Sequence, residues 1–129
     1  MAGTLTISTL SDGTNSTSST NCIQGSARVW VNFTANGGTI NKLKSYNVSS
    51  VTLVGTGIYT VNYTNALADT YGAVVSSCAP AYGSSLLQTS NYDNNSSAYV
   101  SSASAAYLVT KNSAGTLYNS YGVALAVFD

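Results

Sequence analysis

Large apolar and small polar side chains alternate in short runs through the first half of the chain. The clearest runs cover residues 28–33, 44–52, 55–64 and 69–75. A period of two is typical of half-buried strands, because successive side chains of a strand point to opposite faces. No segment has a helical period of comparable strength. This part of the chain is therefore predicted to be a β-module.

Glycine and asparagine separate these runs as turns. Asn36, Gly37 and Gly38 part the Trp30 strand from residues 39–43, and the segment from Gly55 to Gly57 parts residues 49–54 from residues 58–63. Such short Gly-rich connections are typical of hairpins. In the second half we expect strands at residues 86–92, 98–110 and 118–128, with a turn at 112–115. About eight or nine short strands and no helix predict an all-β fold, a single antiparallel β-sandwich of jelly-roll type.

The first 26 residues form a zone of their own. Residues 4–10 alternate like one strand, and residues 11–20 are almost wholly polar or glycine. We expect an extended N-terminal arm and linker at residues 1–26, followed by the β-sandwich domain at residues 27–129. Leu5, Ile7 and Leu10 are too few to order the arm alone, since fixing each residue costs roughly 1 to 2 kcal/mol. The arm is expected to lie on a neighbouring chain, with Leu5 and Ile7 on its buried side.

The composition of the chain favours association with other protein chains over electrostatic attraction of charged ligands. Ser, Thr, Asn and Gly supply 61 of the 129 residues, against eight charged ones, with formal net charge zero and no histidine. A neutral surface has no field to attract nucleic acid, and it tends to associate. No apolar run is long enough to span a membrane, and the first residues lack the features of a secretion signal. We expect no nucleic-acid or membrane partner and no export by that route.

Few side chains could carry chemistry. Catalysis by proton transfer needs a titratable group near neutrality or paired carboxylates, and the acids are Asp12, Asp69, Asp93 and Asp129. The many serines have no histidine to activate them. We therefore predict that the protein is not an enzyme and holds no metal or cofactor.

The two cysteines, Cys22 and Cys78, leave two possibilities. A bridge would close a long loop and stabilise by roughly 4 kcal/mol. Without export the compartment is reducing, which favours two unpaired thiols, at least one of them buried. Because there is no histidine, two distant thiols cannot assemble a closed zinc site.

Three sets of apolar or aromatic residues are candidates for contacts. The chain has ten tyrosines, and seven of them lie between Tyr71 and Tyr121, these two included. Tyrosine suits half-buried packing and subunit interfaces, and it also suits sugar platforms. The candidate ligand or interface tyrosines are Tyr82, Tyr92, Tyr99 and Tyr107. The candidate subunit or capsid contacts are Leu5, Ile7 and Leu10 of the arm and Leu53, Val54 and Ile58 of the apolar hairpin.

Trp30 is the only tryptophan. Both faces of its strand carry bulk, since Val29, Val31 and Phe33 alternate with Arg28, Trp30 and Asn32. We expect this strand to be central in its sheet, with Trp30 against a second sheet or at a subunit contact.

Residues 28–33, 44–52, 55–64 and 66–75 together resemble a module repeated in virion proteins of tailed bacteriophages, notably marine ones. In that group the module occurs in tail fibres, head fibres and small capsid-associated proteins. Residues 4–14 and 120–128 are more loosely similar to the same group. One departure is that the group has polar, acidic residues around the hairpin where this chain has Leu53, Val54 and Ile58.

The resemblance implies a non-enzymatic structural protein of the phage virion. We expect a homotrimer that decorates or cements the capsid or forms a head fibre, with itself and other virion proteins such as the major capsid protein as partners. Its arm would clamp a neighbour by strand addition. The alternative is a small tail-fibre component that binds a host glycan through exposed tyrosines. A third possibility is a bacterial surface adhesin, but such a protein needs an export signal, which the first residues of this chain lack.

Overall fold

The computed structural model describes residues 3, 6–69, 72–79, 88–90, 102–112 and 114–128. Almost all of its regular structure is β. The elements, in chain order, are β1 (Thr9–Ser11), β2 (Ser16–Ser18), α1 (Ser19–Gln24), β3 (Val29–Thr34), the short 3₁₀ turn η1 (Asn36–Gly38), β4 (Asn41–Tyr46), β5 (Val48–Gly55), β6 (Ile58–Tyr63), β7 (Ala73–Ala79), β8 (Gln88–Ser90), β9 (Ala105–Lys111) and β10 (Gly122–Phe128).

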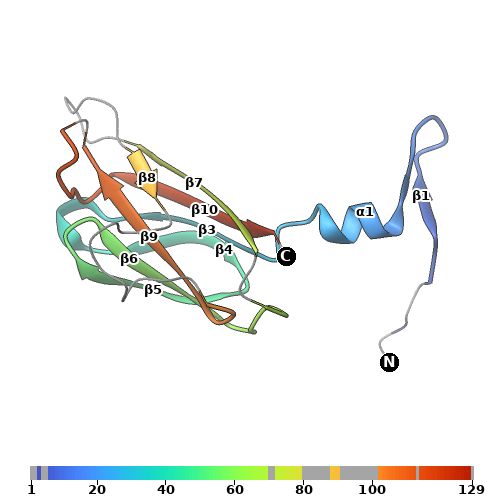
Figure 1. Cartoon of the computed structure of the whole chain (residues 1–129), viewed down its shortest axis with the longest axis horizontal. Coiled ribbons are helices and arrows are strands. Elements are labelled where there is room, and N and C mark those ends of the chain that lie inside the picture. The colour runs from blue at the N-terminus through green and yellow to red at the C-terminus, as the bar shows by residue number, and fades with distance from the viewer. Residues whose placement is uncertain are drawn as a thin grey trace.

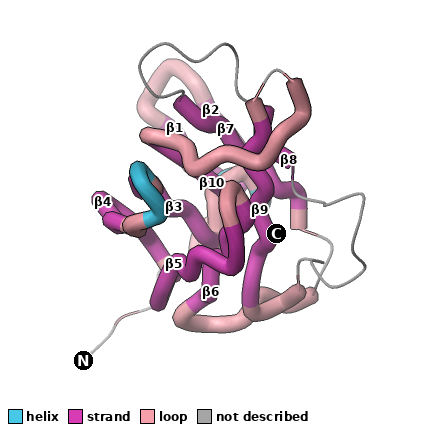
Figure 2. The backbone as a smooth tube through the Cα atoms, turned by 90° about the vertical axis from the view of Figure 1, so that its left-hand side faces the viewer, coloured by secondary structure: helices cyan, strands magenta, loops and turns pink. Residues whose placement is uncertain are grey.

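Eight of the strands form two four-stranded antiparallel sheets. One sheet has the order β4-β3-β10-β7, and the other has the order β5-β6-β9-β8. Figure 1 shows the sheets along the sandwich, and the end-on view of Figure 2 shows them as two layers. The predicted all-β sandwich is thereby confirmed. β3 lies between β4 and β10, so the predicted central place of the Trp30 strand is also confirmed.

The alternating side chains build the core. Val29, Val31 and Phe33 of β3 point inward and are at most 1% exposed. Tyr59 and Val61 of β6 meet them from the other sheet and are fully buried. The remaining members of the core come from β5, β6, β9, β10 and the end of β3: Ala35, Val48, Tyr63, Ala106, Leu108, Val123, Leu125 and Val127. Burial of these apolar faces is the main stabilising force of the fold.

One predicted run divides between the two sheets. Residues 44–52 form one run in the sequence pattern, yet β4 ends at Tyr46 and β5 begins at Val48 in the opposite sheet. Asn47 makes the corner with a φ of 54°, a left-handed conformation that asparagine tolerates better than most residues. The alternation continues across the corner because each of the two strands has one face toward the core and one face toward solvent.

The predicted turns lie where the glycines are. η1 follows β3, with positive φ at Gly37 and Gly38, and the turn of Thr56 and Gly57 joins β5 to β6. At the third turn the Asn112 side chain accepts hydrogen bonds from the backbone N–H groups of Ala114 and Thr116, at 3.0 and 2.9 Å. These connections fix the register of the strands on either side.

Strand ends differ from the sequence pattern in the second half. β7 covers Ala73–Ala79, later than the predicted 69–75, and residues 118–121 form a loop before β10. That loop is held against the turn between β5 and β6, because Asn119 Oδ1 accepts a hydrogen bond from Gly57 N at 2.7 Å. Of the predicted strand at 98–110, residues 98–101 lie outside the described part of the chain.

The arm is a small hairpin followed by a short helix. β1 pairs with β2 in its own chain, and Asp12 closes the turn by accepting hydrogen bonds from the N–H groups of Thr14 and Asn15. These bonds hold the pKa of the Asp12 carboxyl below its usual range. α1 has six residues, of which Gln24 alone is a strong helix former, so no pattern predicted it. In Figure 1 the arm projects from one end of the sandwich and lies against neither sheet.

Candidate functional site

The projecting arm carries exposed apolar side chains. Ile7, Leu10 and Ile23 are 40, 53 and 54% exposed, and with Cys22 they line a hollow of about 380 Å³. Leu5, the remaining arm candidate, lies outside the described residues. Ile7 and Leu10 thus lie on one surface, and Ile23 joins them through α1, an element that the sequence pattern did not predict.

A second apolar surface runs across the outer face of the sheet β4-β3-β10-β7. The strand registers place Tyr46, Trp30, Ala126 and Val75 opposite one another in a single row across all four strands. Tyr46 and Val75 are each 60% exposed, and Trp30 is 38% exposed beside a shallow hollow of about 310 Å³. The expectation that Trp30 packs against a second sheet was therefore wrong. The inward positions of β3 are taken by Val29, Val31 and Phe33, which leaves Trp30 on the outer face.

The apolar hairpin packs mainly against its own chain and contributes little to an outer surface. Leu53 and Ile58 are half-buried, and Leu53 packs against the core and reaches Gly38. Val54 is the member that points outward, with 46% exposure. Whether this hairpin contacts another subunit stays a prediction, and Val54 is the residue on which it now depends.

The candidate tyrosines are mostly outside the described residues. Tyr82, Tyr92 and Tyr99 lie there, and Tyr107 is half-buried on β9 opposite Thr60 of β6. Two tyrosines that sequence reasoning did not single out, Tyr46 and Tyr121, have well-exposed rings, at 60 and 42%.

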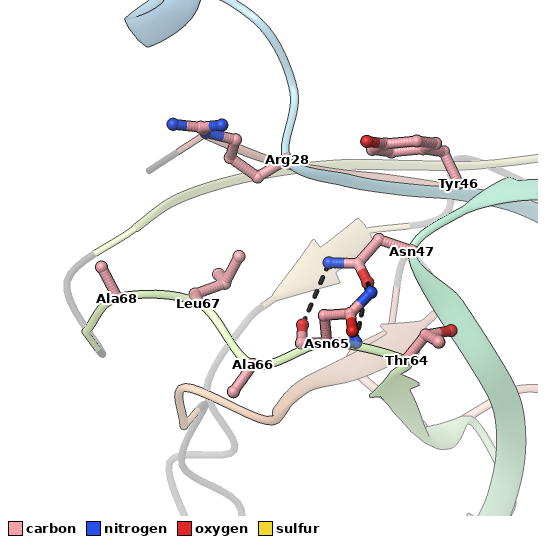
Figure 3. A pocket seen from close by; sticks show the side chains of 8 residues that line it. All are labelled: Arg28, Tyr46, Asn47, Thr64, Asn65, Ala66, Leu67 and Ala68. Atoms are coloured by element: carbon pink, nitrogen blue, oxygen red, sulfur yellow. Dashed lines mark hydrogen bonds between the residues drawn. The ribbon is translucent and has the colours of Figure 1, made fainter. Parts of the chain in front are cut away.

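Tyr46 also borders an open cleft of about 510 Å³ at one end of the sandwich. Figure 3 shows Arg28 and Tyr46 on one side of the cleft and the loop at residues 64–68 on the other. Arg28 lies immediately before β3, and Tyr46 is the last residue of β4. The lining combines a guanidinium, a phenol ring, amides and a hydroxyl with apolar groups: Arg28, Tyr46, Asn47, Thr64, Asn65, Ala66, Leu67 and Ala68.

Asn47 ties the two sides of the cleft together. Its Oδ1 accepts a hydrogen bond from the N–H of Asn65 at 2.8 Å, and its Nδ2 donates to the carbonyl of Asn65 at 3.0 Å. The N–H of Thr64 donates to the backbone carbonyl of Asn47 at 3.2 Å. The corner between the two sheets therefore holds the loop in place. Sequence reasoning had no means to find this cleft, because its residues belong to separate strands and a loop.

The opposite end of the core contains a polar cluster made by the buried Tyr59, Thr110 and Ser120 and the half-buried Cys78. The Tyr59 hydroxyl accepts the N–H of Ser120 at 3.3 Å, and the Thr110 hydroxyl donates to the carbonyl of Tyr118. Burial raises the pKa of Tyr59, and burial also raises the pKa of the Cys78 thiol, which the nearby Ser120 hydroxyl partly offsets. Ser120 Oγ nevertheless makes no hydrogen bond of normal geometry within the described residues. The raised pKa values widen the pH range over which the phenol and the thiol stay neutral, as expected of structural groups.

Cys22 and Cys78 are free and half-buried, as the unpaired alternative predicted, although neither is fully buried. Among the described residues no three acids, cysteines or histidines gather as a metal site would require. Within the same residues no helix has the length and apolar character needed to cross a membrane. Comparison of the chain with protein-family models, with curated proteins and with solved structures found no match.

Proposed function

We propose that this chain is a non-enzymatic structural subunit of a tailed-bacteriophage virion, assembling as a homotrimer that decorates or cements the capsid or forms a head fibre. The observation that carries the proposal is the arm. Its hairpin and six-residue helix expose Ile7, Leu10 and Ile23 and project from the sandwich. A two-stranded hairpin is marginally stable by itself in water, so a partner surface is needed to keep such an arm ordered.

The row of Tyr46, Trp30, Ala126 and Val75 on the outer face of the β4-β3-β10-β7 sheet supplies an apolar surface that an apolar arm can contact. Trp30 and Val75 flank the small side chain of Ala126, which leaves a shallow apolar hollow between them. Exposed apolar patches of this kind mark protein contacts. An arm from a neighbouring copy would bury its isoleucine and leucine side chains there, and the neutral charge of the chain does not oppose that approach.

Two measurements test the proposal. Light scattering on the purified chain should give three times its 13.2 kDa mass. Gold-labelled antibody on intact particles should mark the head. A monomer that also fails to bind shells lacking it would contradict the proposal, and label on the tail tip alone would move the protein to the tail.

The alternative is a tail-fibre component that binds a host glycan through Tyr82, Tyr92, Tyr99 and Tyr107. Three of these residues lie outside the described part of the chain, and Tyr107 is half-buried. The test is a glycan array repeated with Tyr82, Tyr92, Tyr99 and Tyr107 each changed to alanine, since this alternative requires that sugar binding is lost when these tyrosines are removed.

A further inference from the structure

The cleft beside Arg28 and Tyr46 contains polar groups that the fold does not use. Within the described residues, the guanidinium of Arg28 makes no hydrogen bond or ion pair, and the hydroxyls of Tyr46 and Thr64 make none either. Asp69 is the nearest acid along the loop, but it does not line the cleft. Arg28 is the one of the four cationic side chains in the sequence that lines the cleft.

The guanidinium offers a planar fork of donors. That fork matches a carboxylate in a bidentate arrangement, and such charge-assisted bonds are roughly twice as strong as neutral ones. Arg28 lies immediately before β3, and its backbone N–H donates to the carbonyl of Val127 at 2.8 Å. The base of the side chain is therefore held, while its charged end remains free for an anion.

The other side chains of the cleft suit a sugar ring. Tyr46 is 60% exposed and presents an aromatic face, on which the apolar side of a pyranose can stack. The Asn65 amide donates one N–H to Asn47 Oδ1 at 3.3 Å, which leaves its second N–H and its oxygen for sugar hydroxyls, and Thr64 adds a hydroxyl. Their loop is held by Asn47, so these groups are positioned before any ligand arrives. The cleft volume of about 510 Å³ is within the range of small-molecule sites.

We propose that this cleft binds an acidic saccharide, with the carboxylate on Arg28, a pyranose ring on Tyr46 and ring hydroxyls on Asn65 and Thr64. Asn47 acts as a positioning residue. This ligand goes beyond the proposed role in the virion, which requires no sugar, and it uses none of the four tyrosines singled out from the sequence. The cleft can therefore bind whether or not the chain assembles as a trimer.

The probe is trigalacturonic acid, titrated into ¹⁵N-labelled full-length protein. Backbone N–H signals of Tyr46, Asn65 and Ala66 should shift together and saturate, and the shifts should weaken at high ionic strength because the contact is charged. The fully methyl-esterified trisaccharide has the same rings without the carboxylates. It should bind at least about tenfold more weakly, given the strength of a charge-assisted pair.

Matched variants separate the cleft from general surface effects. Arg28→Gln should weaken binding of the acid about tenfold or more and leave the ester unchanged, while Arg28→Lys should recover part of the affinity because charge remains without the fork. Tyr46→Ala should weaken both sugars. Lys44→Gln and Tyr121→Ala remove an exposed cation and an exposed ring outside the cleft, and they should change neither affinity.

Three results would overturn the inference. They are shifts confined to residues outside the cleft, equal binding of acid and ester, and binding of the acid that survives Arg28→Gln in a protein whose spectrum remains folded. If the light-scattering test fails while the cleft titration succeeds, the proposed virion assembly is rejected and the sugar site stands.

Discussion

The rings of Phe33 and Tyr59 meet edge to face across the two sheets, with centroids 5.3 Å apart and planes inclined at 70°. The contact joins β3 to β6 across the core, and both side chains are fully buried. The Tyr59 hydroxyl extends the connection by accepting the N–H of Ser120, 61 residues further along the chain. One side chain thus links both sheets and the loop that precedes β10.

Two substitutions at Tyr59 separate its ring from its hydroxyl. Tyr59→Phe keeps the ring contact but leaves the buried N–H of Ser120 without a partner, so it should lower the free energy of unfolding by about 1 to 3 kcal/mol. Tyr59→Ala also removes the ring and should cost about 3 to 5 kcal/mol. Urea denaturation measures both. Tyr121→Phe, at an exposed position, is the control and should change stability by less than about 0.5 kcal/mol. A Tyr59→Phe protein as stable as the wild type would contradict the assigned hydrogen bond.

Gly57 should not tolerate any side chain. Its φ is +68°, and a Cβ atom there would lie 2.6 Å from both the Thr110 carbonyl oxygen and the Tyr118 nitrogen. Gly57→Ala therefore combines left-handed strain with collision against backbone, and we expect a loss of more than about 3 kcal/mol or failure to fold.

Gly37 is the matched control for this effect. Its φ is +61°, but a Cβ atom there would meet nothing within 4 Å. Gly37→Ala should show the strain alone, about 1 to 2 kcal/mol. Equal losses in the two variants, measured by thermal or urea unfolding, would show that the collision at Gly57 is relieved.

Trp30 should report assembly through its fluorescence. Because it is 38% exposed on an outer face, the isolated chain should emit at a wavelength typical of a partly hydrated indole, and the emission should shift to the blue on association. Trp30→Ala should lower stability of the single chain by only about 1 to 2 kcal/mol, less than the 3 to 5 kcal/mol of a fully buried position. The same variant should weaken the oligomer in light scattering. Emission that is independent of dilution across the dissociation range would exclude this face from the contact.

The arm should be dispensable for folding and required for assembly. A chain that begins at Cys22 lacks β1 and β2 but retains every strand of the sandwich. Its circular dichroism and unfolding midpoint should match those of the full chain, while its mass should fall to that of a monomer and its binding to shells should be lost. The double variant Ile7→Ser with Leu10→Ser should have the same effect through the lost apolar contact. Unchanged attachment would mean that the sandwich alone makes the contact.

Stability should fall at alkaline pH, in part through Tyr63. Burial raises the pKa of Tyr63 from its ordinary value of 10.0 to about 12. A group with a raised folded-state pKa contributes its full stability below the unfolded pKa and loses it as pH rises through the folded one. The loss should therefore occur between about pH 10 and pH 12. Tyr63→Phe cannot ionise and should reduce this part of the dependence, whereas Tyr121→Phe should leave it unchanged in unfolding measured across the same pH range.

Sequence pattern alone determined the β class, the strand at Trp30 and the turns at Gly37 and Gly57. These features are local, since a period of two and a residue able to adopt positive φ can be recognised within a few positions. The same local pattern could not reveal that β4 and β5 belong to different sheets. Alternation persists through Asn47, and only packing on two opposed layers requires the chain to turn there.

The outward face of Trp30 and the cleft at Arg28 were decided by tertiary structure, whereas α1 lies against neither sheet (Figure 1). Composition gave the arm no helical preference, and both faces of the Trp30 strand carry bulk, so alternation did not tell which face was inner. The inner face was set by β10 and β6, whose valines, leucine and tyrosines pack on Val29, Val31 and Phe33. Arg28, Tyr46 and Asn65 are separated in sequence and meet because strand registers and the Asn47 hydrogen bonds bring them together. A pattern along one strand cannot predict such contacts, because they depend on distances between segments that only the folded chain defines.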